Sequence, residues 1–262
     1  MRLTAVGVSY AYVPGEEVLR DVSLSLADGE VVFVLGSNGS GKTTLLHCLS
    51  GMHQPTSGTV TVDDRPLVQL TPRERARRIG VVPQLHEPAF AFTVAEAVLM
   101  GRAPHLGLFA RPGRDDRAIV DRALAAVGIL ALRGRAYTEI SGGEQQLVLV
   151  ARGLAQGARC LLMDEPAAHL DPRHRHEILG TARGLAADGH SFVVTSHQPD
   201  NAFLYADSVL LLVDGRAQGY GTPGEALTEE SLRAAYGMEF EILRGESGAR
   251  AVVPRIRPAS SD

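Results

Sequence analysis

Gly36-Ser37-Asn38-Gly39-Ser40-Gly41-Lys42-Thr43 is the stretch of this sequence that decides the fold. It follows a continuous apolar run, Val31–Leu35, and leads into residues with helical spacing, Lys42–Ser50. A strand that is apolar throughout is typical of a sheet with both faces buried, and the glycines interrupt the pattern between strand and helix. The pattern is a glycine, any four residues and then Gly-Lys-Thr. Between a buried strand and a helix, this pattern predicts a phosphate-binding loop.

The residue types of this loop suit a nucleotide that is bound together with magnesium. Glycines allow backbone N–H groups to turn inward around phosphate oxygens, and the helix N-terminus adds the positive end of its dipole. We expect Lys42 to reach the outer phosphates, the Thr43 hydroxyl to ligate Mg²⁺, and Thr44 to belong to the nucleotide-binding set. The motif predicts nucleotide binding, but ATPases and GTPases share it.

Two carboxylates, Asp164 and Glu165, follow a second apolar run, Cys160–Met163. Ligands of open α/β sheets bind beyond the carboxyl ends of the strands, where these side chains would lie. We expect Asp164 to face Mg²⁺, directly or through water, and Glu165 to polarise the attacking water, since phosphoryl transfer depends on an oriented nucleophile. The alternative, a charge pair that caps a turn, is disfavoured by the phosphate-binding loop in the same chain.

The composition excludes several classes of protein. The 262 residues include 26 basic and 30 acidic ones, a net charge of -4, which does not indicate a nucleic-acid-binding surface. Cys48 and Cys160 lie in apolar surroundings and are expected to be small core residues, which fits a reducing cytoplasm. No secretory signal is visible, and the apolar runs are far shorter than the roughly 20 residues that cross a bilayer. Any link to a membrane is therefore expected to run through a partner.

Apolar strands alternate with helical segments along the chain, which indicates an α/β protein with a mostly parallel sheet. Further strands are expected at residues 3–10, 18–26, 58–62, 79–82, 191–195 and 209–213. Residues 93–132 are rich in Ala, Leu, Arg and Glu with helical periodicity, which indicates an inserted helical subdomain. After a helical segment at 223–236, residues 240–243 and 251–253 predict a terminal hairpin, and the residues beyond Pro254 resemble a loose end.

A second glycine-containing segment lies shortly before the acidic strand end and leads into an apolar helical run. It reads Ile140-Ser141-Gly142-Gly143-Glu144-Gln145-Gln146. A Ser-Gly-Gly helix start can present a hydroxyl and backbone N–H groups to an anion. Here the chain resembles the ATP-binding-cassette (ABC) family, whose signature is Leu-Ser-Gly-Gly-Gln, with Ile140 and Glu144 as conservative departures. The resemblance implies that residues 141–144 bind the γ-phosphate of ATP held by a second copy, in a head-to-tail dimer that sandwiches two ATP molecules.

Other positions match the family's motifs in order over roughly residues 1–240. Gln84 matches the glutamine that senses magnesium and water, Asp171 the loop aspartate that communicates across the dimer, and His197 the histidine that contacts the γ-phosphate. The resemblance therefore implies a catalytic set of Glu165, His197 and Gln84, with Gln84 also near Mg²⁺. Tyr12 is expected to stack on adenine, with Tyr10 as the alternative.

The resemblance also implies the fold, an α/β P-loop NTPase core with an N-terminal antiparallel β subdomain and an inserted helical subdomain at about 89–157. We expect one ABC ATPase domain over residues 1–240 and a hairpin with a loose tail over 241–262. The histidines His169, His174 and His176 do not indicate a metal site, because side chains two residues apart on a helix point to different faces.

Two stretches resemble the branch of the family that serves uptake of iron–siderophore complexes, haem and cobalamin. They are residues 70–84, LTPRERARRIGVVPQ, and residues 101–105, GRAPH. The implied function is the ATP-hydrolysing subunit of an importer for a metal chelate. Leu147, where many members have arginine, also occurs in molybdate-type relatives, so a molybdate or tungstate importer is one alternative. A soluble member that does not transport, such as an iron–sulphur assembly ATPase, is another.

The implied partners are a second copy of the chain, integral membrane permease subunits and an extracytoplasmic substrate-binding protein, with no nucleic acid. The implied location is the cytoplasmic face of the inner membrane, where the chain is peripheral and held by the permease. The resemblance further implies that ATP closes the dimer, that closure pulls the docked permease, and that hydrolysis releases it.

Overall fold

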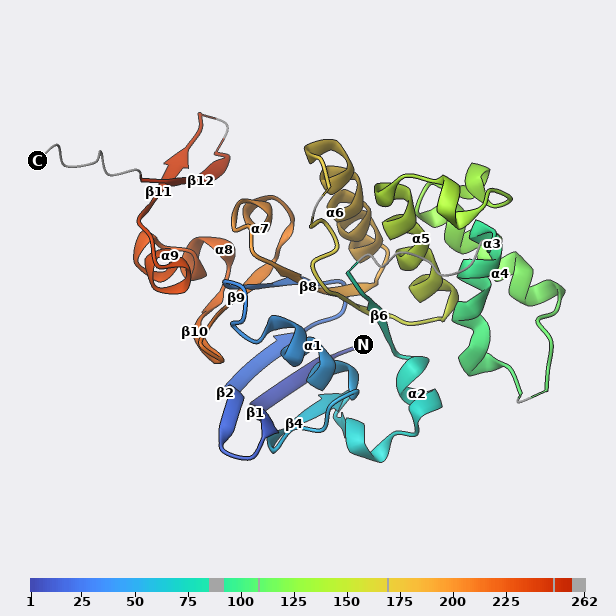
Figure 1. The fold of residues 1–262 in the computed structure, drawn as a ribbon, viewed down its shortest axis with the longest axis horizontal. Helices are drawn as coiled ribbons and strands as arrows, with labels where there is room; N and C mark the ends of the chain where they lie inside the picture. The colour runs from blue at the N-terminus through green and yellow to red at the C-terminus, as the bar shows by residue number, and fades with distance from the viewer. Residues whose placement is uncertain (85–91, 108, 169, 247, 256–262) are drawn as a thin grey trace, which may run out of the picture.

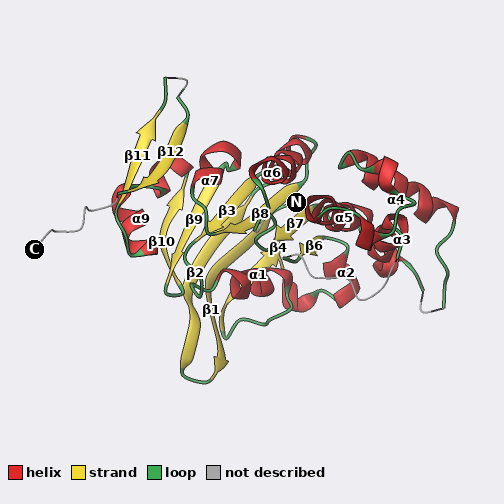
Figure 2. Cartoon of the chain, turned by 45° about the horizontal axis from the view of Figure 1, so that its top comes forward, coloured by secondary structure: helices red, strands yellow, loops and turns green. Residues whose placement is uncertain are grey.

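The computed structural model describes residues 1–84, 92–107, 109–168, 170–246 and 248–255. These residues form a four-stranded sheet, a six-stranded sheet and a two-stranded hairpin, with helices against the sheets (Figures 1 and 2). None of the described helices is both long enough and apolar enough to span a membrane.

The six-stranded sheet lies at the centre and positions the site. Its strands run in the order β10 (Arg216–Gly221), β9 (Ser208–Val213), β3 (Val31–Leu35), β8 (Ser191–Ser196), β7 (Cys160–Met163) and β6 (Ile79–Val82). All neighbouring pairs are parallel except β9 and β10. Leu35 pairs with Ser196 and Val82 with Met163, so the carboxyl ends of these parallel strands lie at one edge. All of these strands except β10 match strands expected from the sequence.

The strand β3 is apolar throughout because both of its faces are covered. Val31, Phe33 and Leu35 pack into one core together with helices α5 (Gly142–Ala155) and α6 (Pro172–Ala187). Val32 and Val34 pack into a second core with α1 (Lys42–Ser50) and the N-terminal sheet. Strands β7 and β9 divide their side chains between the two cores in the same way. The residues on either side of the phosphate-binding loop are therefore fixed by packing.

The N-terminal sheet is antiparallel, with the order β2-β1-β4-β5. It consists of β1 (Leu3–Val13), β2 (Glu16–Leu26), β4 (Ser57–Val62) and the short β5 (Arg65–Pro66). The first hairpin extends further than the expected 3–10 and 18–26, because Val13 pairs with Glu16 across a tight turn. Cys48 and Cys160 are both buried as expected, and burial raises the pKa of the Cys48 thiol to about 11 and that of Cys160 to about 12.

The segment that connects β6 to β7 along the chain is helical. It lies on the opposite side of the molecule from the C-terminal hairpin (Figure 1). Its helices are α3 (Val94–Leu99), α4 (Arg114–Ala126) and α5, with 3-10 turns at Met100–His105, Leu130–Leu132 and Tyr137–Glu139. The expected start of this helical part, near residue 89, lies outside the described residues. The two stretches that resemble the metal-chelate importer branch, residues 70–84 and 101–105, contact each other. Arg77, after α2 (Pro72–Ala76), donates to the Pro104 carbonyl from Nε at 3.1 Å and from Nη2 at 3.0 Å.

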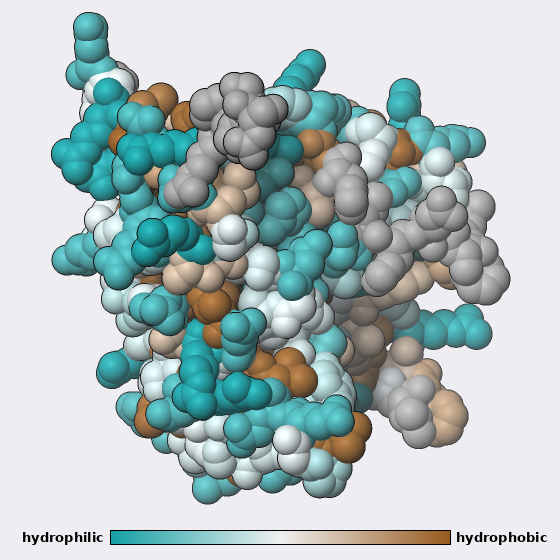
Figure 3. Space-filling view, turned by 60° about the vertical axis from the view of Figure 1, so that its left-hand side comes forward, coloured by the Kyte–Doolittle hydropathy of each residue, from teal (hydrophilic) through white to brown (hydrophobic). Residues whose placement is uncertain are grey.

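The C-terminal part consists of short helices and a hairpin. The helices are α7 (Asp200–Tyr205), α8 (Pro223–Ala226) and α9 (Glu229–Tyr236), and the hairpin strands are β11 (Phe240–Arg244) and β12 (Arg250–Pro254). The expectation of one helical segment over 223–236 is wrong, because Leu227 is extended and Thr228 caps a new helix. The expected hairpin is confirmed, whereas residues 256–262 of the expected tail lie outside the described residues. On the face drawn in Figure 3, hydrophilic residues predominate over small, separate apolar patches.

Candidate nucleotide-binding site

The loop from Gly36 to Thr43 connects β3 to α1 and wraps around the side chain of Lys42. Lys42 is only 6% exposed, and its Nζ donates to the carbonyl oxygens of Gly36 at 2.9 Å and Ser37 at 3.0 Å. The backbone between the end of β3 and the start of α1 thus surrounds the Lys42 ammonium group. This is the arrangement expected of a phosphate-binding loop.

Two glycines of the loop are required by the backbone itself. A Cβ at Gly36 would lie 2.3 Å from the carbonyl oxygen of Leu212 in β9 and 2.6 Å from Ser40 Oγ. Gly41, the residue that caps α1, has a φ of 103°, which side-chain-bearing residues rarely adopt. The close approach and the left-handed conformation explain why glycine occupies these positions.

Asp164 and Glu165 follow β7 and are held by a threonine from β8. Thr195 Oγ1 donates to Asp164 Oδ1 at 2.7 Å and accepts from the backbone N–H of Glu165 at 2.8 Å. Thr195 is fully buried, and Glu165 has a positive φ of 43°. Thr195 was not among the expected site residues, although its position two residues before His197 at the end of an apolar strand was a usable signal.

Glu165 lies between Lys42 and His197. Its Oε1 is 3.4 Å from Lys42 Nζ and its Oε2 is 2.9 Å from His197 Nδ1, and its side chain is 17% exposed. The proposed base, the lysine of the loop and the proposed γ-phosphate contact therefore meet at the carboxyl ends of β3, β7 and β8. A small cavity lies beside Glu165 and His197, and its lining includes the apolar residues Phe33 and Leu179 and no residue of the phosphate-binding loop.

The oxygen atoms at this edge fit a magnesium ion and phosphate. The Thr43 side chain is exposed at the start of α1, and Asp164 stands at the end of β7. Hydroxyl and carboxylate oxygens are ligands that Mg²⁺ prefers. Among the described residues, the buried Ser40 Oγ has no hydrogen-bond partner, which fits a loop that completes its polar contacts with a ligand.

Gln84 is brought to the same edge by the backbone of its neighbours. The Asp164 N–H donates to the Val82 carbonyl at 2.9 Å, and Gln146 of α5 donates to the Pro83 carbonyl at 3.3 Å. Gln84 therefore follows a segment that is tied both to the acidic strand end and to the helix of the signature. The residues directly after it, 85–91, lie outside the described part of the chain.

The two candidate adenine contacts differ in accessibility. Tyr12 is 57% exposed, and its hydroxyl lies 3.2 Å from Thr44 Oγ1, next to the phosphate-binding loop. Tyr10 is partly buried and stacks on His53, with ring centroids 4.9 Å apart and planes within 8°. Tyr12 packs edge-on against both rings. These contacts favour Tyr12 as the residue with a free ring face.

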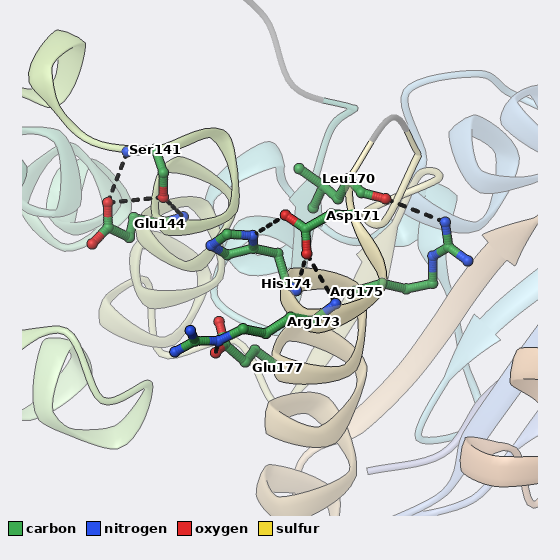
Figure 4. Close-up of polar contacts among 8 residues, drawn as sticks. All are labelled: Ser141, Glu144, Leu170, Asp171, Arg173, His174, Arg175 and Glu177. Atoms are coloured by element: carbon green, nitrogen blue, oxygen red, sulfur yellow. Dashed lines mark hydrogen bonds and ion pairs between the residues drawn. The ribbon is translucent and has the colours of Figure 1, made fainter.

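The signature begins helix α5 with a capping box (Figure 4). Ser141 Oγ accepts from the Glu144 N–H at 3.3 Å, and Glu144 Oε2 accepts from the Ser141 N–H at 2.7 Å. Ser141 Oγ also donates to Glu144 Oε2 at 2.8 Å, and the two hydrogen bonds that Ser141 donates to this carboxylate lower the pKa of Glu144. Within the described residues, no hydrogen bond or ion pair joins residues 141–144 to the phosphate-binding loop of the same chain.

Asp171 caps the next helix, α6, at the other side of the signature (Figure 4). Its Oδ1 accepts from the backbone N–H groups of Arg173 at 2.9 Å and His174 at 3.1 Å. Of the three histidines considered above, His174 contacts Asp171, His176 contacts the Tyr205 hydroxyl on α7, and His169 lies outside the described residues.

A further neighbour of the loop was not identified from the sequence. Tyr236, at the end of α9, stacks edge-on against Phe240. Burial raises the pKa of the Tyr236 hydroxyl; the Gly36 backbone lowers it and the Glu165 carboxylate raises it further. Helix α9 contacts β9, the strand beside β3, and the sequence holds no local signal for this packing.

Comparison with known proteins places these features in context. The family model described as ABC transporter matches residues 19–168. The hemin import ATP-binding protein HmuV of Thermobifida fusca is 43% identical over 241 residues, covering 92% of this chain and 83% of that protein. The cobalamin import ATP-binding protein BtuD of Halobacterium salinarum is 43% identical over 243 residues, covering 92% of this chain but only 60% of that longer protein. A solved structure described as a metal-chelate type ABC transporter in an inward-facing conformation is 30% identical, with a TM-score of 0.86 over 97% of this chain and 98% of that chain.

Proposed function

The chain belongs to the ABC transporter family, and from this we propose that it powers an importer that takes up a metal chelate through a partner permease. It is an ATP-binding ATPase subunit with the expected P-loop NTPase fold. Hemin and cobalamin import proteins are among its relatives, which supports haem and cobalamin among the expected cargo classes, and iron–siderophore complexes are the third class of metal chelate that we propose.

The observation that carries the ATPase mechanism is the position of Glu165 between Lys42 and His197. In this mechanism Lys42 leaves the loop carbonyls for the outer phosphates of ATP, and Glu165 accepts a proton from the attacking water. His197 contacts the γ-phosphate and orients Glu165 through the 2.9 Å contact. Mg²⁺, held by Thr43 and Asp164 with Gln84 nearby, would neutralise the charge that develops on the phosphate oxygens.

We further propose that two copies of the chain sandwich two ATP molecules head to tail. In this arrangement the helix start at Ser141, Gly142 and Gly143 binds the γ-phosphate of the ATP on the partner's loop. The feature that supports this arrangement is a helix start with glycines at 142 and 143, which can present backbone N–H groups to an anion. In the dimer, the Glu144 carboxylate would give up its capping hydrogen bonds with Ser141 and face the partner copy. Asp171 would communicate across the same interface.

The proposed partners also include integral membrane permease subunits and an extracytoplasmic substrate-binding protein. The proposed location is the cytoplasmic face of the inner membrane, through the permease. Dimer closure would pull the permease, and hydrolysis would release it. The alternatives are a molybdate or tungstate importer and a soluble non-transporting ATPase, and no contact among the described residues favours either over uptake of a metal chelate.

The test is reconstitution with the permease that copurifies from native membranes. The complex would be placed in vesicles, and ATP-driven uptake of haem, cobalamin, a ferric siderophore and molybdate would be compared, with Lys42→Ala as the inactive control. Uptake of one chelate that depends on Lys42 supports the proposal. Uptake of molybdate alone, or copurification with only a soluble scaffold, would overturn it.

A further inference from the structure

The side chain of His174, in the first turn of α6, is held by Asp171 (Figure 4). His174 Nδ1 lies 2.5 Å from Asp171 Oδ2, while Asp171 Oδ1 accepts the backbone N–H groups of Arg173 and His174. One carboxylate thus caps the helix with one oxygen and binds the imidazole with the other. The orientation of this carboxylate is therefore coupled to the position of the ring.

The other side of the imidazole lies against the signature. A Cβ placed on Gly143 would lie 2.5 Å from His174 Cδ2 and 2.8 Å from Cγ. Only a glycine lets the start of α5 approach the ring this closely. His174 therefore connects two helix starts: it hydrogen-bonds the capping residue of α6 and packs against the buried glycine of α5.

The charged groups around the ring come from both helices. On α6 they are Asp171, Glu177 and Arg173, of which Arg173 pairs with Glu177 at 3.0 Å. On α5 the nearby carboxylate is Glu144, whose pKa the His174 charge helps to lower. The hydrogen bond with Asp171 raises the pKa of His174, and the same bond is the largest influence that lowers the pKa of Asp171.

We propose that His174 is a positioning residue that locks Asp171 to the signature glycine Gly143, so that both reach the partner copy as one unit when ATP closes the dimer. This inference rests on the ATP-sandwich dimer of the proposed function. Because no hydrogen bond or ion pair joins His174 to the phosphate-binding loop within the described residues, its loss should weaken dimer closure and turnover while leaving nucleotide binding to a single chain intact. A preorganised pair loses less conformational freedom on association than two independent groups.

Two substitutions separate the hydrogen bond from the packing. His174→Leu keeps apolar volume beside Gly143 but removes the donor to Asp171, whereas His174→Asn places an amide N–H near the position of Nδ1. His176→Leu, on the same helix but in contact with Tyr205, is the matched control. ATP-dependent dimerisation would be measured for the full chain carrying Glu165→Gln, and kcat and KM for ATP in the Glu165 background.

We expect His174→Leu to weaken dimerisation and lower kcat by about tenfold or more, the effect of one charge-assisted hydrogen bond. His174→Asn should recover most of this loss, and His176→Leu should resemble the parent. Affinity for MgADP, which reports binding to one loop, should stay within about twofold in all three. Parental dimerisation and turnover in His174→Leu, or no recovery in His174→Asn, would overturn the inference.

A double-mutant cycle tests the contact with Gly143 and decides the matter if His174→Leu does not fold. Gly143→Ala should impair dimerisation less in a His174→Ala background, because the ring that the new Cβ would strike is gone. Strictly additive effects would contradict the contact.

If the parental chain neither dimerises with ATP nor hydrolyses it, the proposed function itself fails. If the parent does both and only the His174 effects are missing, the proposed function stands without this inference.

Discussion

Glu165 Oε1 lies 3.4 Å from Lys42 Nζ, which joins the carboxylate at the end of β7 to the ammonium group at the start of α1. Lys42 is the only lysine in the sequence. In the structure its charge is satisfied by Glu165 and by two loop carbonyls. ATP must therefore replace contacts that already exist, and the same exchange frees Glu165 to act on water.

Replacing Lys42 with alanine should weaken ATP binding by about tenfold or more, because hydrogen bonds to charged groups contribute roughly 1.5–3 kcal/mol. Equilibrium binding of a fluorescent ATP analogue would measure this. As Lys42 is the only lysine, its acylation in the parental chain can be followed by mass spectrometry, and bound ATP should slow it. If Lys42→Ala binds ATP with unchanged affinity and ATP does not slow the acylation of Lys42 in the parental chain, residues 36–43 are not the phosphate-binding loop.

Thr195→Val should destabilise the fold and reduce turnover. The substitution preserves the shape of a fully buried side chain but leaves Asp164 without its donor and the Glu165 N–H without its acceptor. The free energy of unfolding in urea should fall by about 1–3 kcal/mol. Thr181→Val, which removes a hydroxyl that donates to the Glu177 carbonyl on α6, is the control and should change stability by no more than about 0.5 kcal/mol. Equal effects of the two substitutions would show that Thr195 has no special role.

Tyr12→Leu should weaken ATP binding, whereas Tyr10→Leu should mainly lower stability. Tyr12 is exposed beside Thr44, and loss of a base–aromatic stack costs about 1–3 kcal/mol. Tyr10 is stacked on His53 in the protein itself. Binding and urea unfolding measured on both variants distinguish the two roles, and the reverse pattern would assign adenine to Tyr10.

The ion pair of His174 and Asp171 should make stability depend on pH. Its hydrogen bond raises the pKa of His174 above the ordinary 6.5, so the pair contributes fully below pH 6.5 and loses strength as the pH rises through the raised pKa. The difference in unfolding free energy between the parent and His174→Asn should therefore shrink from pH 6 to pH 9. The charged groups that shift the pKa of His174 are Asp171, Glu177 and Arg173, and His174 in turn lowers the pKa of Glu144. A difference that does not change with pH would contradict the ion pair.

Much of the fold could be predicted because apolar runs report burial on both faces of a sheet. The strands β3, β6, β7, β8 and β9 are of this kind, and the comparisons confirm the fold class inferred from them. The strand β10 was missed because its sequence, RAQGYG, lies at the sheet edge and needs little apolar character. The break between α8 and α9 was missed because Leu227 continues the helical spacing although its backbone is extended.

The candidate site was predictable where motif residues are adjacent in sequence and not where they meet only in space. Asp164 and Glu165 follow a recognisable strand, but their support by Thr195 depends on the pairing of β7 with β8. The contact of His174 with Gly143 likewise depends on how α5 packs against α6. No local pattern encodes these two contacts. The roles of Gln84, Asp171 and His197 stay predictions, although the structure places His197 at the expected strand end.

The most direct test of the central claim is single-turnover hydrolysis of ATP by the Glu165→Gln chain, beside the parent and with ATP binding measured in parallel. The amide keeps the shape of the side chain and its contact with His197 but cannot accept the proton of water. We predict that Glu165→Gln binds ATP with parental affinity, hydrolyses it at least about a hundredfold more slowly, and accumulates as a closed dimer. Hydrolysis at the parental rate would contradict the claim that Glu165 is the base.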